Sequence, residues 1–250
     1  MNATQTGEIA KINLVQDQSP QKAAKRAGLL YLIFIVTFAV SFFIQSKPIV
    51  SGDEAATARN ILASQSLFRF GFMLELISAV FFLLSAWALY VILKPVNENL
   101  AFLFVLLLLA GVAIECVGKA SHFVALTLLS SADYSKVFQA GQLQGLAMLF
   151  LGLDNIGGSI SALFYGVWLF PLGYLVIKSG FLPRILGILL IADGFCVLIC
   201  FFQIFLFPGY EKLTYPLFPV MFIAEFSLGL WLMIRGVKIK DRDQSIRPTI

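Results

Sequence analysis

The stretch "AFLFVLLLLAGVAIECVGKASHFVALTLLS", residues 101–130, decides the fold class of this chain. A helix needs about 20 mostly apolar residues to cross the hydrocarbon of a bilayer. This stretch exceeds that length, and Glu115, Lys119 and His122 are its only ionisable side chains apart from Cys116. The stretch therefore predicts a membrane-spanning helix that carries an unusual polar group inside it.

The composition of the whole chain agrees with a membrane protein. Of its 250 residues, 59% are hydrophobic and 13% are charged, and the mean hydropathy is +0.89. Soluble domains have about a quarter charged residues, so this chain is predicted to be an integral membrane protein in contact with lipid. The net charge of +4 then indicates a basic cytoplasmic face, and no nucleic-acid partner is expected.

Apolar runs separated by polar or proline-containing segments predict six spans and an all-α, polytopic six-helix bundle. The predicted spans are 28–45, 67–93, 100–130, 154–178, 184–207 and 215–235. The predicted organisation is a polar tail over 1–26, a transmembrane domain over 27–237 and a basic tail over 238–250. The polar lead before the first apolar run is too long for a cleaved signal peptide, which predicts that the first span is retained.

Two further segments are predicted to be helical without spanning the membrane. Residues 53–66 begin with an acidic pair and contain good helix formers, which predicts a short helix at the membrane surface. Residues 133–151 begin with polar side chains, and we expect an interfacial or partly inserted helix there. It would lead into the fourth span with a break near "GLDNIGG", residues 152–158.

The distribution of lysine and arginine predicts the orientation. Placing both termini in the cytoplasm puts twelve of these residues inside and five outside, with Lys119 within the membrane. Basic residues concentrate on the cytoplasmic side of membrane proteins, and an even number of spans places both termini on one side.

Several ionisable side chains fall inside the predicted spans. Each costs about 2.5–3.5 kcal/mol at mid-helix, so most should face the bundle interior. They are Glu75, Glu115, Lys119, His122, Asp154, Asp193 and Glu225, and Asn155 adds an uncharged polar group.

Glu115, Lys119 and His122 follow one another at helical spacing and predict a polar stripe on one face of the third span. Glu115 precedes Lys119 by four residues, which is the favourable order for an intrahelical ion pair. One interpretation is an outward-facing pocket that binds a small molecule or an ion, or passes protons. Its ligand-binding residues would be Glu75, Lys119, His122, Asp154 and Asn155, with Glu115 and Glu225 at its base. The alternative is a structural or regulatory subunit in which the buried charges only hold the helices in register.

An enzyme is the least favoured interpretation, and no catalytic residue, metal or cofactor is predicted. A zinc site needs three or more ligands around an open position, and one histidine with scattered acids matches this poorly. Nucleophilic catalysis needs an activating base beside the nucleophile, whereas Ser121 and His122 point apart on a helix. A lipid-active enzyme is kept only as a third interpretation.

Four stretches carry a resemblance to a known family: "GDEAATARNILASQSLFRFGF" (52–72), "LYVILKPVN" (89–97), "KSGFLPRILGILL" (178–190) and "AEFSLGLWLMIRGVK" (224–238). The chain resembles, over roughly residues 24–238, bacterial multi-span proteins with the domain of unknown function 4386. The resemblance implies acidic residues at the positions of Glu75 and Glu225 and a location in the bacterial cytoplasmic membrane. It implies no established activity.

Overall fold

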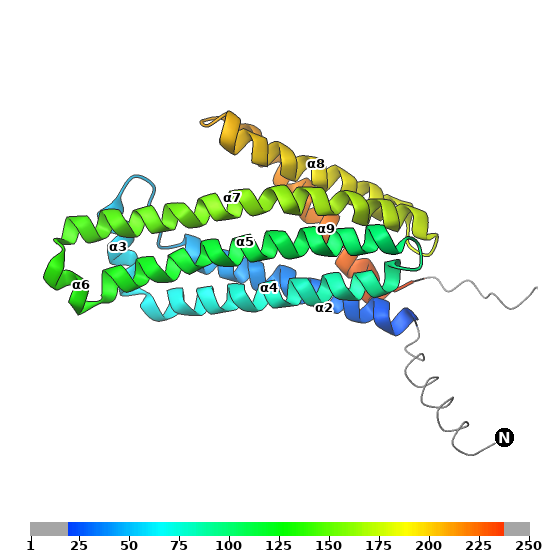
Figure 1. Ribbon diagram of the computed structural model, residues 1–250, viewed down its shortest axis with the longest axis horizontal. Helices are drawn as coiled ribbons and strands as arrows, with labels where there is room; N and C mark the ends of the chain where they lie inside the picture. The colour runs from blue at the N-terminus through cyan, green and yellow to red at the C-terminus, as the bar shows by residue number, and fades with distance from the viewer. Residues whose placement is uncertain (1–19, 238–250) are drawn as a thin grey trace, which may run out of the picture.

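The computed structural model describes residues 20–237, and these form a bundle of long helices (Figure 1). Six helical segments in this range are long and apolar enough to cross a membrane, which confirms the predicted all-α, multi-pass membrane fold. The elements are α2 (Pro20–Ser46), α3 (Glu54–Ala63), α4 (Gln65–Leu93), α5 (Glu98–Ser130), α6 (Ala132–Val137), α7 (Ala140–Ser179), α8 (Arg184–Leu206), η1 (Glu211–Leu213), η2 (Tyr215–Leu217) and α9 (Phe218–Ile234).

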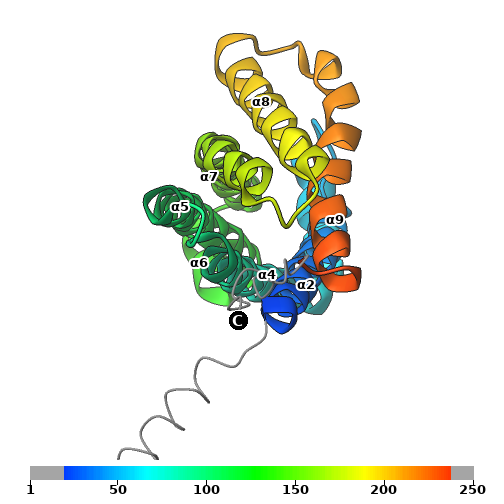
Figure 2. The ribbon, with the colours of Figure 1, turned by 90° about the vertical axis from the view of Figure 1, so that its right-hand side faces the viewer.

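The six long helices form a closed ring, which is visible end-on in Figure 2. Around this ring α2 contacts α4, α4 contacts α5, α5 contacts α7, α7 contacts α8, and α9 joins α8 back to α2. Neighbouring long helices in the ring are thus consecutive in the sequence, apart from α9 and α2, which close the ring. Their side chains meet in the middle of the ring, where a polar residue can be kept away from lipid.

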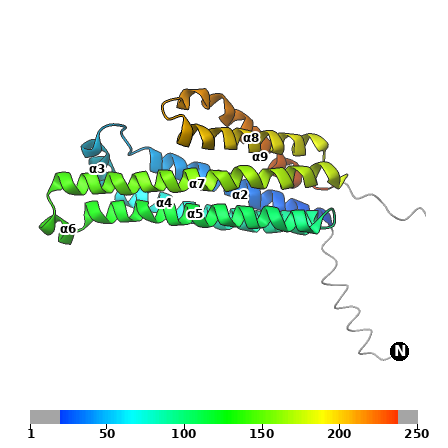
Figure 3. The same ribbon diagram turned by 45° about the horizontal axis from the view of Figure 1, so that its top comes forward.

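The short helices mark one end of the bundle, which we call the α3 end. Helices α3 and α6 both lie there (Figures 1 and 3). Asp53 accepts a hydrogen bond from the Ala56 backbone N–H at 2.7 Å, so the acidic pair does cap this helix as predicted.

The described chain begins and ends at the opposite end of the bundle. Gln21 on the first turn of α2 donates to the Arg235 carbonyl at 2.8 Å and accepts from the Val237 N–H at 3.0 Å. Helix α2 begins at Pro20, so the last residues of the predicted polar tail, 20–26, are helical. The basic tail over 238–250 and residues 1–19 lie outside the described residues.

The predicted break near residues 152–158 is wrong. Helix α7 runs without interruption from Ala140 to Ser179 and includes most of the predicted interfacial segment. Helix α6 is a separate helix of 6 residues. One glycine in this region, Gly157, serves helix packing: a Cβ there would lie 2.9 Å from the Cα of Gly118 on α5. Small residues allow two membrane helices to approach this closely without interrupting either one.

Helices α7 and α8 are held together by a second glycine contact, and it yields a test. A Cβ on Gly173 would lie 2.7 Å from the Gly187 carbonyl oxygen, whereas a Cβ on Gly145, in the same helix, meets no atom within 4 Å. We expect Gly173→Ala to cost about 1–3 kcal/mol by overpacking. Gly145→Ala should instead stabilise α7 by about 0.5–1 kcal/mol through helix propensity. Thermal unfolding in detergent measures both, and equal effects would contradict the close α7–α8 contact.

Candidate functional site

A polar layer crosses the bundle between two apolar clusters. The larger cluster contains Phe82, Phe104 and Trp168 and fills the ring toward the end where the chain begins and ends. The smaller cluster lies toward the α3 end. Helices α2, α4, α5 and α7 each place polar side chains in the layer between them, and we call this group the His122 network. Its members are Ser41, Gln45, Glu75, Lys119, His122 and Asp154.

Lys119 joins two acidic residues from different helices. Its Nζ lies 3.0 Å from Glu75 Oε1 on α4 and 3.0 Å from Asp154 Oδ2 on α7. Both carboxylates are buried, with 6% and 4% of their surfaces exposed. The Lys119 ammonium therefore links α4, α5 and α7, and its two ion pairs run between helices.

His122 uses both of its ring nitrogens in the network. Nε2 lies 2.9 Å from Asp154 Oδ2, and Nδ1 lies 2.6 Å from Gln45 Oε1. The ring also packs against Phe68, with ring centroids 5.6 Å apart. His122 thus links α5 to α7 on one side and to α2 on the other.

The orientation of the Gln45 amide follows from its other partners. Its Nε2 donates to Glu75 Oε2 and, at 2.8 Å, to Ser41 Oγ. Ser41 Oγ in turn donates to the Gly71 carbonyl at 2.8 Å. If the amide were reversed, its oxygen would face the Glu75 carboxylate, and two acceptors cannot form a hydrogen bond. The Gln45 oxygen therefore faces His122 whenever Glu75 is ionised.

These contacts define the protonation state of His122. A carboxylate and an amide oxygen are both acceptors, so each ring nitrogen facing one of them must donate. With Glu75 and Asp154 ionised, the hydrogen bonds are complete only when His122 is an imidazolium. Two cations, Lys119 and His122, then balance two anions, Glu75 and Asp154.

Glu115 lies beside this network and does not form the predicted intrahelical pair with Lys119. Among the described residues its hydrogen-bond partner is Tyr165 of α7, whose hydroxyl donates to Glu115 Oε2 at 2.5 Å, while Lys119 reaches the carboxylates of α4 and α7. Acids on neighbouring helices offer Lys119 two partners at 3.0 Å, which outweighs one partner on its own helix.

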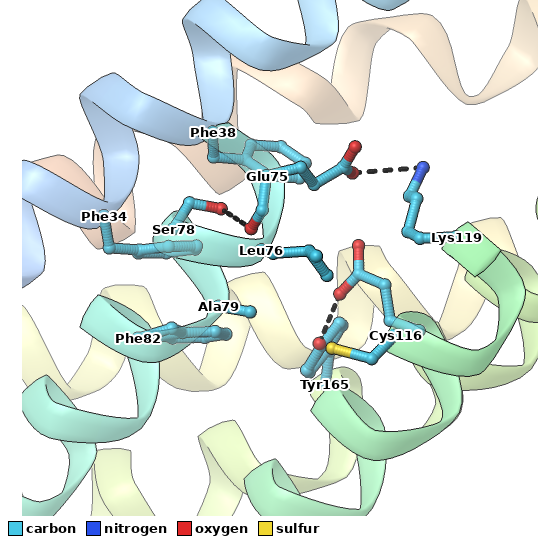
Figure 4. Close-up of a pocket in the computed structure, with 11 residues that line it drawn as sticks. Phe34, Phe38, Glu75, Leu76, Ser78, Ala79, Phe82, Cys116, Lys119 and Tyr165 are labelled. Atoms are coloured by element: carbon cyan, nitrogen blue, oxygen red, sulfur yellow. Dashed lines mark hydrogen bonds and ion pairs between the residues drawn. The ribbon is translucent and has the colours of Figure 1, made fainter. Parts of the chain in front are cut away.

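A small cavity separates Glu115 from Glu75. Figure 4 shows Lys119 reaching Glu75 above it and Tyr165 below it, with Phe34 and Phe82 on its apolar side. Its volume is about 20 Å³, enough for about one water molecule. This cavity has no room for an organic ligand.

An apolar cluster separates the network from the α3 end. Its buried members are Ile61, Phe68, Ala125, Leu126, Ala147 and Leu151. They come from α3, α4, α5 and α7 and lie on the side of the network on which the sequence predicts the pocket to open. One acceptor within the network stays unfilled, because Asp154 Oδ1 is buried with no partner among the described residues.

Two of the predicted site residues lie outside the network. Asn155 is exposed on α7, because it follows Asp154 on the helix and points to another side. Glu225 lies on α9, which packs against α2 and α8 on another side of the ring. The structure thus brings together Glu75, Lys119, His122 and Asp154, places Glu115 at their edge, and separates the other two.

Two network residues, Ser41 and Gln45, and Tyr165, the partner of Glu115, escaped the sequence analysis. Ser41, Gln45 and Tyr165 are uncharged, and residues of these types occur at the ends and within membrane helices without any partner. The spacing of Ser41 and Gln45 by one helical turn was the available signal, since it places both hydroxyl and amide on one face of the first span.

Metal binding finds no support within residues 20–237. No group of three or more histidine, cysteine or acidic side chains there is arranged to hold a metal ion. Cys116, Cys196 and Cys200 are free thiols.

Comparison with known proteins adds the family. The model of the domain of unknown function DUF4386 matches residues 26–236, nearly the whole described chain. The chain belongs to this family. A DUF4386 assignment carries no activity, so the His122 network has to be interpreted from its own chemistry.

The chain is also similar to an archaeal protein. An uncharacterized protein of Archaeoglobus fulgidus is 28% identical over 156 residues, which cover 62% of this chain and 77% of that protein. The similarity therefore extends outside bacteria, and a bacterial origin does not follow from it. No solved structure matches the chain.

Proposed function

We propose that this DUF4386 protein reversibly binds one proton in the His122 network and couples that proton to the position of α2. The observation that carries the proposal is the Gln45 amide, whose oxygen faces His122 Nδ1 and whose nitrogen donates to Glu75. Among ligands of a polar pocket, a proton fits a layer whose cavity holds about one water molecule.

The network retains one proton in either orientation of the amide. In the observed orientation His122 carries it and Glu75 is ionised. If the amide turns over, its nitrogen donates to a neutral His122, and Glu75 must be protonated to donate to the amide oxygen. Turning the amide therefore moves the proton between α5 and α4 and keeps the contacts of Gln45 with His122 and Glu75, while the hydrogen bond from the Gln45 nitrogen to Ser41 Oγ is lost.

Loss of the proton has a structural consequence. Without it, the one proton left on His122 stays on Nε2, because the Asp154 carboxylate is a stronger acceptor than an amide oxygen. The Gln45 oxygen then faces either a bare ring nitrogen or an ionised carboxylate, so one contact of α2 with α4 or α5 must break. An unmade buried hydrogen bond costs about 1–3 kcal/mol. Release of the proton is thus expected to loosen the end of α2 near Ser46.

The charged and polar groups that surround His122 come from four helices. Helix α4 contributes Glu75, α7 contributes Asp154, and α5 contributes Lys119, while α2 contributes the neutral Gln45. Glu115 lies one step further, beyond Lys119. In the amide orientation of the structure, His122 carries the exchangeable proton, so it is the site of proton exchange in the proposal.

The test is a measurement of the distance between α2 and α5, because the proposal expects α2 to loosen when the proton is released. Phe43 on α2 and Val117 on α5 are exposed, at 76% and 75%, and accept spin labels in a chain whose three cysteines are replaced. We expect the distance distribution between the two labels to broaden as the pH is raised from 6 to 9. In His122→Gln, whose side chain cannot titrate, the distribution should not depend on pH. A wild-type distribution that is unchanged while His122 loses its proton would overturn the proposal.

A purely structural role is the second candidate, and the pairing of Lys119 with two carboxylates favours it. In that case the buried charges only hold α4, α5 and α7 in register. The two candidates differ in the spin-label experiment, because a structural network gives the same distances at every pH at which the protein stays folded.

We also propose that both ends of the chain lie in the cytoplasm. The start of α2 and the end of α9 are joined through Gln21, so the two ends leave the bundle on the same side. The distribution of twelve against five lysine and arginine residues supports the cytoplasmic side. The His122 network then lies in the outer half of the membrane.

A further inference from the structure

The end of the bundle opposite the α3 end, which we call the Lys94 end, carries a large excess of positive charge. The starts of α2, α5 and α8 and the ends of α4, α7 and α9 lie together there (Figure 1). Within residues 20–237 these helix ends hold one acid, Glu98, and seven exposed basic residues: Lys22, Lys25, Arg26, Lys94, Lys178, Arg184 and Arg235. The opposite helix ends, with α3, α6 and the α8–α9 connection, hold five basic residues and four acids. The excess of cations is thus confined to one end of the bundle.

The charge of this end is not neutralised within the described chain. Five of its basic side chains form no ion pair with any described residue: Lys25, Lys94, Lys178, Arg184 and Arg235. Arg184 is the first residue of α8, and the first turn of that helix contains no acid. A cation at a helix N-terminus is repelled by the helix dipole, so the α8 backbone does not compensate this charge either. A partner of negative charge would therefore relieve repulsion at the Lys94 end.

Two of these cations have the same local arrangement on different helices. Lys94 follows the last residue of α4, and its Nζ lies 5.8 Å from the ring centroid of Tyr90. Lys178 is in the last turn of α7, and its Nζ lies 5.8 Å from the ring centroid of Tyr174. Tyrosine is enriched at the membrane–water interface, and lysine extends from there toward the headgroups. Both ammonium groups are therefore expected at the level of the lipid phosphates.

The side chains next to these lysines are aromatic and exposed. Tyr174 is 45% exposed, and Trp87, which is 57% exposed, stacks on Tyr90 with ring centroids 5.1 Å apart. A ligand of this surface thus meets an ammonium group and, directly beside it, an apolar ring. An anionic phospholipid supplies a partner for both, because its phosphate pairs with the ammonium and its acyl chains contact the rings. Free phosphate and a water-soluble polyanion supply only the negative charge.

We infer that the Lys94 end binds the headgroups of anionic phospholipids, with Lys94 and Lys178 among the residues that contact the phosphates. Basic side chains beside a membrane are attracted to anionic lipids, and each is worth about a factor of five in affinity. The inference does not rest on the proposed proton binding, because no member of the His122 network belongs to this surface. It is also independent of the proposed orientation, since the surface is defined by the helix ends alone.

The first test needs no variant and compares two lipids that differ in charge. The full chain in neutral detergent is unfolded thermally after addition of phosphatidylglycerol or of phosphatidylcholine with the same acyl chains. We expect a higher unfolding temperature with phosphatidylglycerol and a smaller difference at high salt, because salt screens exposed charges. Glycerol 3-phosphate, which has the phosphate without acyl chains, should give no such rise. Equal unfolding temperatures with the two lipids, or an equal rise with glycerol 3-phosphate, would overturn the inference.

The second test locates the surface by titrating phosphatidylglycerol and counting bound lipids with native mass spectrometry. The double variant Lys94→Gln with Lys178→Gln should bind this lipid about 10- to 30-fold more weakly than the unmodified chain. The matched control, Lys136→Gln with Lys212→Gln, removes two exposed lysines at the opposite helix ends and should bind it unchanged. His122→Gln should also bind it unchanged, so failure of this inference and failure of the proposed function are distinguishable. Unchanged binding in the first double variant, or equal weakening in both, contradicts the inference.

Discussion

Lys119→Met is expected to lower the free energy of unfolding by about 3–5 kcal/mol, the largest single effect in this chain. Removing one partner of a buried ion pair leaves an uncompensated charge. Here two buried carboxylates, Glu75 and Asp154, each lose an ammonium at 3.0 Å. Chemical or thermal unfolding of the purified protein in detergent measures the loss.

Lys136→Met is the matched control. Lys136 Nζ lies 2.8 Å from Asp133 Oδ1, a shorter distance than either Lys119 pair, but both side chains are largely exposed. Exposed pairs contribute about 0–1 kcal/mol, so this variant should change stability little. Equal losses in the two variants would show that burial of the Lys119 pairs does not determine their strength.

Gln45→Leu is expected to have the second-largest effect, a loss of about 1–3 kcal/mol. Leucine leaves Glu75 Oε2 without the amide donor and His122 Nδ1 without an acceptor, and unmade buried hydrogen bonds cost this much. Because an imidazolium needs an acceptor at both nitrogens, His122 should also become a neutral imidazole that donates only to Asp154.

Thr37→Val, on the same helix, is the control for this variant. The Thr37 hydroxyl donates to the Ile33 carbonyl at 2.7 Å within α2 and contacts no other helix through a hydrogen bond among the described residues. Its removal should leave both stability and the state of His122 unchanged. A Gln45→Leu protein as stable as Thr37→Val, with His122 still an imidazolium, would contradict the role given to the amide.

Much of the fold was predictable because bilayer thickness imposes a simple length rule. Runs such as 67–93 and 100–130 exceed the length of a span, and α4 and α5 begin and end within two residues of these predictions. The prediction failed at residues 152–158, where glycine and polar residues were read as a break. In the bundle Gly157 packs against Gly118 of α5 within a continuous helix, which a sequence pattern does not reveal.

The candidate site was predictable only where it is charged. Glu75, Lys119, His122 and Asp154 stand out because charge in a membrane is costly and has to be paired. Gln45 carries no such signal, yet its amide oxygen lies 2.6 Å from His122 Nδ1. The interhelical partners of Lys119 were equally hidden, because they depend on how α4 and α7 are placed around α5.

The state of His122 is the most direct test of this account, and the chain contains one histidine. In protein labelled with ¹⁵N-histidine and purified without a histidine tag, the ring nitrogens give a single pair of resonances. At neutral pH we expect both nitrogens to have the chemical shifts of protonated nitrogen, as in an imidazolium bonded to Gln45 and Asp154. One protonated and one bare nitrogen, with Glu75 ionised, would contradict the account.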